Sequence, residues 1–370
     1  MSVTHDAFYM AKALHLAAKG RYTTAPNPRV GCVLVKDDVI IGEGYHVQAG
    51  LGHAEVVALS NTLDAKGATA YVTLEPCSHQ GRTPPCCDVL IKAGISRVVV
   101  AMQDPNPLVS GRGLEKLKES GIEVCCGVLQ EDALALNRGF IKRMTLNLPF
   151  VRSKLAMSLD GRTAMASGES QWITGTEARA DVQRLRAESS AILTGINTVL
   201  ADDPALNARV DDDVLQPVRV VLDTHLNTPV TAKMAKLPGR SLILTCAQDQ
   251  KKQYLLQQAG FEVYQLPEKN GQVDLSAVMN FLAGQQINEL LVEAGSVLNG
   301  ALLDEGLVDE YVIYMAPCIL GDQGRGLFVL PGLQLMADKK QLKLLDVRQV
   351  GSDLKLTYTP YITRHPCLQA

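Results

Sequence analysis

The sequence has no long apolar run and no signal-like start. Its longest apolar stretches are the length of a strand, such as residues 98–102, whereas a membrane-spanning helix needs about 20 apolar residues. Residues 1–6 are polar and include Asp6, unlike the basic segment and apolar core of a secretory signal. We therefore expect a cytoplasmic protein without a membrane partner.

The sequence also lacks an excess of charge of one sign. Lys and Arg total 36, Asp and Glu total 39, and the formal net charge is −3. A broad nucleic-acid surface needs a basic balance, so we expect no nucleic-acid partner. There is only one tryptophan, but 46% of the residues are hydrophobic, which is enough to build large cores. A length of 370 residues suggests two domains.

Cysteines are too few and too unevenly placed for a disulfide scaffold. There are nine, an odd number, and six of them lie in the first 130 residues. Secreted scaffolds carry denser, paired cysteines. A reducing compartment and one thiolate metal site explain this distribution better.

Strand and helix patterns alternate in both halves of the chain. In the first half we expect helices at residues 8–19, 53–63, 86–93, 113–120 and 133–144, and strands at 30–35, 39–42, 69–74, 97–102 and 122–128. The second half alternates similarly and ends in two strands within residues 342–358. This alternation predicts two layered α/β domains. The segment Asn147-Leu148-Pro149 suggests a boundary, so the expected domains are residues 1–146 and 147–370.

The strongest chemical signal is a set of metal-ligating residues in the first half. His53 is followed two residues later by Glu55, and Cys77 is separated from Cys86 by eight residues. One imidazole and two thiolates suit zinc and leave a fourth position open for water. A zinc ion lowers the pKa of such a water toward neutrality. The residue types therefore predict a zinc site at His53, Cys77 and Cys86, with Glu55 as the catalytic proton carrier.

Other readings of these residues remain open. Cys87 or His79 could complete a closed structural zinc site, and Cys87 could replace Cys86 as a ligand. Cys125 and Cys126 lie in an expected strand and favour packed thiols. A polynucleotide deaminase would share the zinc chemistry, but it predicts the shorter Cys-x-x-Cys spacing and a basic surface.

Residues 26–31, 42–55 and 76–86 together resemble the deaminase of riboflavin biosynthesis, and the likeness extends over most of residues 5–145. The resemblance implies a cytidine-deaminase-like three-layer domain that deaminates 2,5-diamino-6-(5-phosphoribosylamino)pyrimidin-4-one. It also implies a substrate pocket lined by Asn27, His46, His79 and Arg82. Asn27 could instead be a turn residue between prolines, and His46 could be a surface histidine at the end of a strand. Either His79 or Arg82 could be a solvated side chain.

The second half gives weaker local signals. Residues 291–296 form a strand followed by a glycine turn and an apparent helix, and the N–H groups at such a helix start favour phosphate. This is not the Gly-x-Gly-x-x-Gly fingerprint. On its own, the junction leaves cofactor binding open.

Residues 158–174 and 198–206 resemble the reductase of the same pathway, and the likeness covers roughly residues 148–360. It implies a dihydrofolate-reductase-like α/β fold. NADPH would contact Ala156, Trp172, Thr198, Asp202, Thr224 and the turn and helix made by Gly295, Ser296, Val297, Leu298, Asn299, Gly300 and Ala301. The ribosylaminouracil phosphate would be held by Lys154, Ser170, Arg186, Leu206, Arg209 and Glu293.

Several of these residues also have plain structural readings. Lys154 and Glu293 could form an ion pair, and Arg186 or Arg209 could be a solvated charge. Trp172 could lie in a core or an interface, and Asp202 could cap a turn.

The whole chain thus resembles a bifunctional riboflavin biosynthesis deaminase–reductase that uses zinc and NADPH. Its partner would be a small-molecule pyrimidine ribosylamine phosphate, and we expect a homo-oligomer. Two alternatives remain: an active deaminase joined to a degenerate reductase domain, and a structural zinc module joined to a noncatalytic scaffold.

Overall fold

A computed structural model describes residues 3–78, 84–106 and 110–361. The chain divides into two compact units, residues 1–148 and 149–370. The division lies two residues beyond the boundary expected from the sequence. Within the described ranges, no helix is both long and apolar enough to cross a membrane.

The first unit is built on a five-stranded sheet with the order β2-β1-β3-β4-β5. β1 is antiparallel to β2 and β3, whereas β3, β4 and β5 are parallel. The strands are β1 (Gly31–Lys36), β2 (Val39–Tyr45), β3 (Thr69–Val72), β4 (Arg97–Val100) and β5 (Glu123–Cys126).

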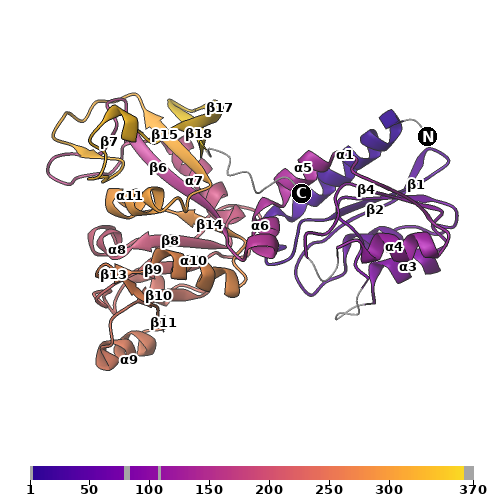
Figure 1. Ribbon diagram of the computed structural model, residues 1–370, viewed down its shortest axis with the longest axis horizontal. Coiled ribbons are helices and arrows are strands. Elements are labelled where there is room, and N and C mark those ends of the chain that lie inside the picture. The colour runs from indigo at the N-terminus through magenta and orange to yellow at the C-terminus, as the bar shows by residue number, and fades with distance from the viewer. Residues whose placement is uncertain (1–2, 79–83, 107–109, 362–370) are drawn as a thin grey trace. The chain divides into compact units, whose positions relative to one another are not determined.

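Helices cover both faces of this sheet. Successive residues of a strand point to opposite faces, and neighbouring core residues accordingly belong to different clusters. Val33 packs with helix α1, whereas Cys32 and Leu34 pack with α2, α3 and α4. Figure 1 shows α1 and α5 on one side of the sheet and α3 and α4 on the other. The helices are α1 (Val3–Lys19), α2 (Ala54–Ser60), α3 (Cys86–Lys92), α4 (Arg112–Glu119), α5 (Gln130–Leu136) and α6 (Arg138–Leu146). The three-layer prediction is confirmed.

The single helix expected at residues 133–144 is wrong, because the chain breaks it at Asn137 into α5 and α6. The buried Asn137 side chain accepts a hydrogen bond from the Arg29 N–H at 2.8 Å and donates one to the Arg29 carbonyl at 2.9 Å. An asparagine amide can imitate a backbone pairing in this way. The break therefore anchors the segment that leads into β1.

The second unit contains a nine-stranded sheet with the order β11-β10-β9-β8-β14-β6-β15-β18-β17. Its strands from β11 to β15 are parallel, and the expected pair of final strands, β18 and β17, is confirmed as an antiparallel hairpin. The main strands are β6 (Phe150–Ser158), β8 (Ala191–Gly195), β9 (Val218–Leu222), β10 (Ser241–Thr245), β11 (Glu262–Gln265), β14 (Glu289–Val292), β15 (Glu310–Ala316), β17 (Leu342–Val350) and β18 (Asp353–Pro360). Short strands β7 (Arg162–Ala164) and β16 (Arg325–Gly326) pair separately, as do β12 (Glu268–Lys269) and β13 (Gln272–Val273).

The helices of this unit join its parallel strands. They are α7 (Thr176–Glu188), α8 (Ile196–Asp202), α9 (Gln250–Gln258), α10 (Leu275–Gly284) and α11 (Ser296–Asp304). After β8 the chain adds β9, β10 and β11 outward, and then returns to insert β14 between β8 and β6. In open α/β sheets, ligands bind at the carboxyl ends of the strands where the direction of chain progression changes. Here that place is the junction of β8 and β14.

Candidate active sites

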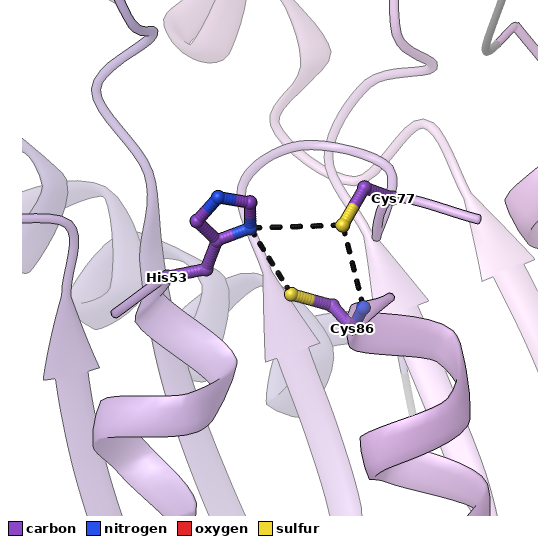
Figure 2. Close-up of side chains that lie close together, drawn as sticks. All are labelled: His53, Cys77 and Cys86. Carbon is purple, nitrogen blue, oxygen red and sulfur yellow. Dashed lines mark hydrogen bonds between the residues drawn. The ribbon is translucent and has the colours of Figure 1, made fainter. Parts of the chain in front are cut away.

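Three metal-ligating side chains converge in the first unit. The Nδ1 atom of His53 lies 3.2 Å from the Sγ atom of Cys86 and 3.6 Å from the Sγ atom of Cys77. The three ligand atoms all lie within 4.8 Å of one another, and Figure 2 shows the side chains pointing toward a common centre. Ligands bound to zinc at about 2.0–2.3 Å lie roughly 3.5–4 Å apart. The donor set and its spacing therefore fit a zinc ion.

Local structure brings these ligands together. His53 immediately precedes α2, Cys86 begins α3, and Cys77 lies in the segment after β3. The Cys86 N–H donates to the Cys77 sulfur at 3.3 Å. Hydrogen bonds from Cys86 and His53 lower the pKa of Cys77 to about 4. The hydrogen bond to Cys77, together with burial, raises the pKa of Cys86. Cys77 is therefore the sulfur whose ionised form the protein favours, and a thiolate is the form in which cysteine binds metal.

Glu55 lies two residues after His53, at the start of the same helix. It is in the first turn of α2, and only 3% of its surface is exposed. Burial raises the pKa of Glu55 above its ordinary value. A buried carboxyl group with a raised pKa suits a proton carrier near neutral pH.

Asn27 and His46 lie together in a hydrogen-bonded pair. The Asn27 Nδ2 atom lies 3.0 Å from the His46 Nε2 atom, and the His46 Nδ1 atom lies 3.1 Å from the Gly52 carbonyl. His46 is buried, and its ring packs edge-on to that of His53 at 5.5 Å. The alternative in which His46 is a surface histidine at the end of a strand is therefore wrong.

The other residues considered for this site are His79, Arg82 and three further cysteines. His79 and Arg82 lie outside the described residues. The Cys87 thiol donates to the Pro76 carbonyl at 3.2 Å and burial raises its pKa to about 12, so it does not belong to the ligand group found within the described ranges. Cys125 packs against the core, but Cys126 is exposed, so the expectation of a packed thiol is wrong for Cys126.

A buried charge cluster occupies the second unit at β6, β14 and α7. The guanidinium of Arg186 donates to both carboxylate oxygens of Glu293, at 2.6 and 2.9 Å. Burial alone would raise the pKa of Glu293, but the charge and hydrogen bonds of Arg186, together with the charges of Lys154 and Arg209, hold that pKa below its usual value. Burial lowers the pKa of Lys154, and Glu293 opposes this. The ion pair of Glu293 is therefore formed with Arg186, and Lys154 lies within its electrostatic influence.

Two helices begin at the β8–β14 junction. Gly195 precedes α8, which carries Thr198 and Asp202, and Gly295 precedes α11. Ser296, Asn299 and Gly300 are buried, whereas Val297 is 62% exposed; Gly295 and Ala301 are also exposed and Leu298 is half-buried. The Asn299 amide donates to the Ala294 carbonyl and accepts from Ser153. At Gly300 an added Cβ would lie 2.1 Å from the Val329 carbonyl oxygen. Asn299 and Gly300 thus serve packing within the unit, and Gly295, Val297 and Ala301 present the exposed part of this turn.

Trp172 lies in the loop before α7. It is 71% exposed, so the core reading of this residue is wrong. The Arg179 guanidinium lies over its ring at 4.8 Å from the centroid. The neighbouring Gln171 donates to the Asp202 carboxylate at 3.3 Å, which brings this loop to α8. Ser170 is half-buried in the same loop.

Four further predicted residues are more scattered. Ala156 is half-buried on β6, and Thr224, after β9, donates to the Gln272 side chain at 3.0 Å. Leu206 is 2% exposed and packs in the core, so only its backbone is available to a substrate. Arg209 is exposed and donates to Asn207 at 3.2 Å.

Sequence reasoning missed two residues beside these sites. Glu75 accepts hydrogen bonds from three backbone N–H groups next to the Cys77 segment. Its position directly before Pro76 and Cys77 was a usable signal. Arg179 gave no signal, because nothing local distinguishes it from other charges of α7.

Two families match the chain. Residues 3–102 match the cytidine and deoxycytidylate deaminase zinc-binding region, and residues 149–356 match the RibD C-terminal domain. The first implies zinc and the second a nicotinamide cofactor. The expected folds, cytidine-deaminase-like and dihydrofolate-reductase-like, are confirmed.

Relatives match over nearly the whole length. The riboflavin biosynthesis protein RibD of Escherichia coli strain K12 is 51% identical, over 95% of this chain and 98% of that protein. The structure of RibD from Acinetobacter baumannii matches with a TM-score of 0.90 at 48% identity, over 97% of this chain and 99% of that one. A diaminohydroxyphosphoribosylaminopyrimidine deaminase/5-amino-6-(5-phosphoribosylamino)uracil reductase from Thermotoga maritima matches with a TM-score of 0.85 at 34% identity, with the same coverage. The chain therefore belongs to the RibD family of riboflavin biosynthesis, whose members combine a deaminase domain with a reductase domain.

Proposed function

We propose that this chain deaminates 2,5-diamino-6-(5-phosphoribosylamino)pyrimidin-4-one in its first unit and reduces the ribosyl group of the product to ribityl with NADPH in its second. The observation that carries the first half is the convergence of His53, Cys77 and Cys86 beside the buried Glu55. The second half rests on the family match and on the cluster of Arg186, Glu293 and Lys154.

In the deaminase site, His53, Cys77 and Cys86 would hold zinc, which supplies an activated water at neutral pH when bound. Glu55 accepts a proton from the attacking water and delivers it to the departing amino group, which leaves as ammonia. Burial keeps this carboxyl group out of bulk water, and its raised pKa allows it to carry the proton. Asn27 and His46 would bind the pyrimidine, and His79 and Arg82 would bind its phosphate end.

In the reductase site, NADPH supplies the reducing equivalents when bound. The turns at Gly195 and Gly295 offer N–H groups to its phosphates. Arg209 is exposed and offers its guanidinium to the substrate phosphate. The fork of Arg186 is held by Glu293, so Arg186 would contact the substrate as part of that ion pair. Lys154 lies within the field of the pair and would polarise the sugar. Ser170, Leu206 and Glu293 would complete the substrate site, and Ala156, Trp172, Thr198, Asp202 and Thr224 the cofactor site.

A substitution at Glu55 tests the deaminase. We expect Glu55→Gln to lower ammonia release at least about 100-fold while zinc stays bound, because it removes the proton carrier and none of the ligands. Glu43→Gln on β2, where the side chain is exposed, is the matched control and should leave the rate unchanged. Full turnover in Glu55→Gln would contradict the assignment.

Oxidation of NADPH tests the reductase in the same chain. With the deaminated intermediate supplied, we expect NADPH to be consumed by the Glu55→Gln variant as by the unaltered protein. No consumption in either would favour the alternative of a working deaminase joined to a degenerate reductase domain. A parallel assay with NADH tests the preference for NADPH, and sedimentation tests the expected homo-oligomer.

A further inference from the structure

The loop that carries Trp172 presents a large flat ring to solvent. Trp172 is the only tryptophan of the chain, and its side chain is 71% exposed. A single exposed apolar side chain is common on protein surfaces, so the contacts of this ring distinguish it, rather than its exposure. One face of this ring is already covered, because the Arg179 guanidinium lies 4.8 Å from its centroid.

Arg179 makes two further contacts that fix its orientation. Its Nη1 atom donates to the Thr174 carbonyl at 2.6 Å, and its Nη2 atom donates to the Thr176 hydroxyl at 3.2 Å. A guanidinium is planar with a rigid fork of donors, so these bonds also set the plane that it presents to the ring. Arg179 therefore ties the first turns of α7 to the loop that precedes them.

Both ends of this loop are anchored to other elements. On one side Gln171 donates to Asp202 of α8 at 3.3 Å. On the other, the Gly175 N–H donates at 2.7 Å to Asp353, a buried residue of the final hairpin. Trp172 lies between these two contacts, and Arg179 packs on its ring.

We propose that Arg179 is a positioning residue for cofactor binding: it covers one face of Trp172 and so presents the other face to a flat ring of the bound dinucleotide. This inference rests on the proposed reductase function. A cation over one face of an aromatic ring is attracted by its π-electrons, and two hydrogen bonds hold the guanidinium in place. The ring is then oriented before the cofactor arrives, which reduces the entropy lost on binding.

The test measures binding and does not require turnover. In the zinc-loaded full chain, NADP⁺ binding is followed by calorimetry and by the fluorescence of the single tryptophan. We expect Arg179→Ala to weaken NADP⁺ binding roughly three- to thirtyfold, and Arg179→Lys, which keeps the charge but loses the planar fork, to lie between it and the unaltered chain. Arg184→Ala, on the exposed side of the same helix, is the matched control and should bind NADP⁺ normally.

A double-mutant cycle separates positioning from a general structural role. If Arg179 acts through the ring, Arg179→Ala should have no further effect on NADP⁺ affinity in a Trp172→Ala chain. An equal loss in both backgrounds, or normal affinity in Arg179→Ala, would overturn the proposal. Binding of 2′,5′-ADP identifies the ring: an unchanged affinity in Arg179→Ala points to nicotinamide, and a loss that again disappears in Trp172→Ala points to adenine. If the unaltered chain binds no NADP⁺, the proposed reductase function itself fails.

Discussion

At the scale of single residues, a buried carboxylate lies beside the proposed zinc ligands without being one of them. Glu75 is 3% exposed and accepts the N–H groups of Asp104 at 3.1 Å, Gly111 at 2.9 Å and Gly113 at 2.8 Å. The carbonyl oxygen of the next residue, Pro76, accepts a hydrogen bond from the Cys87 thiol. Three donors on one buried carboxylate are worth more than neutral hydrogen bonds. Glu75 thus fixes the backbone two residues before Cys77.

We predict that Glu75→Gln weakens zinc binding about 10- to 100-fold, because residues that orient metal ligands typically contribute this much. The glutamine amide cannot accept three N–H groups, since one end of it is a donor. Zinc release to a chromogenic chelator measures the effect. Glu115→Gln, at an exposed position of α4, is the control and should release zinc at the normal rate. An unchanged rate of zinc release in Glu75→Gln would show that the carboxylate holds the local backbone but does not affect zinc binding.

At the scale of elements, a largely buried ion pair joins helix α1 of the first unit to the sheet. Asp6 of α1 accepts two hydrogen bonds from Arg97 of β4, at 2.7 and 2.8 Å, and one from the hydroxyl of Tyr71 of β3 at 2.9 Å. These bonds, the one from Arg97 first, lower the pKa of Asp6 below its usual value. α1 is therefore held by charge as well as by its apolar face.

The sign of this shift predicts how stability varies with pH. A carboxyl group whose pKa is lower in the folded than in the unfolded chain stabilises the fold above its unfolded pKa, and this contribution is lost as the pH falls through the folded value. We expect Asp6→Asn to lower the free energy of unfolding by about 1–3 kcal/mol at pH 7, and the difference from the unaltered chain to shrink as pH falls from about 5 toward 3. Thermal unfolding across this range measures it. Asp37→Asn, at an exposed turn where asparagine suits the positive φ of 51°, is the control. A difference that is independent of pH would contradict the explanation.

At the scale of the whole molecule, two compact units each carry one proposed ligand site. A ligand stabilises the part of a protein that binds it by an amount that grows with its concentration over Kd. We predict that removal of zinc by a chelator lowers the unfolding temperature of residues 1–148, and that NADP⁺ raises that of residues 149–370. Scanning calorimetry of the full chain with each ligand separately measures this. Equal shifts of all transitions by either ligand would show that the two units unfold as one.

The sequence predicted the layers, and the three side chains that converge in the first unit, better than the surroundings of either site. Strand periodicity and helix spacing are local, so the elements of both sheets were expected nearly where they lie. The helix break at Asn137 was not, because its cause is a pairing with Arg29, which is 108 residues away. Likewise, the exposure of Trp172 and of Cys126 depends on which elements cover these side chains, and local spacing does not specify that.

By itself, the sequence determined the chemistry of this protein: one imidazole, two thiols and a carboxyl group at fixed spacing, in motifs that resemble one family of deaminases, followed by a half that resembles its reductase. Only the tertiary structure decided which polar groups meet. Glu75 finds its donors 29 to 38 residues away, and Asp353 reaches Gly175 across 178 residues. The reason is physical: apolar periodicity drives each element to a layer, whereas a hydrogen bond forms only where the packed backbone brings a donor and an acceptor to about 3 Å.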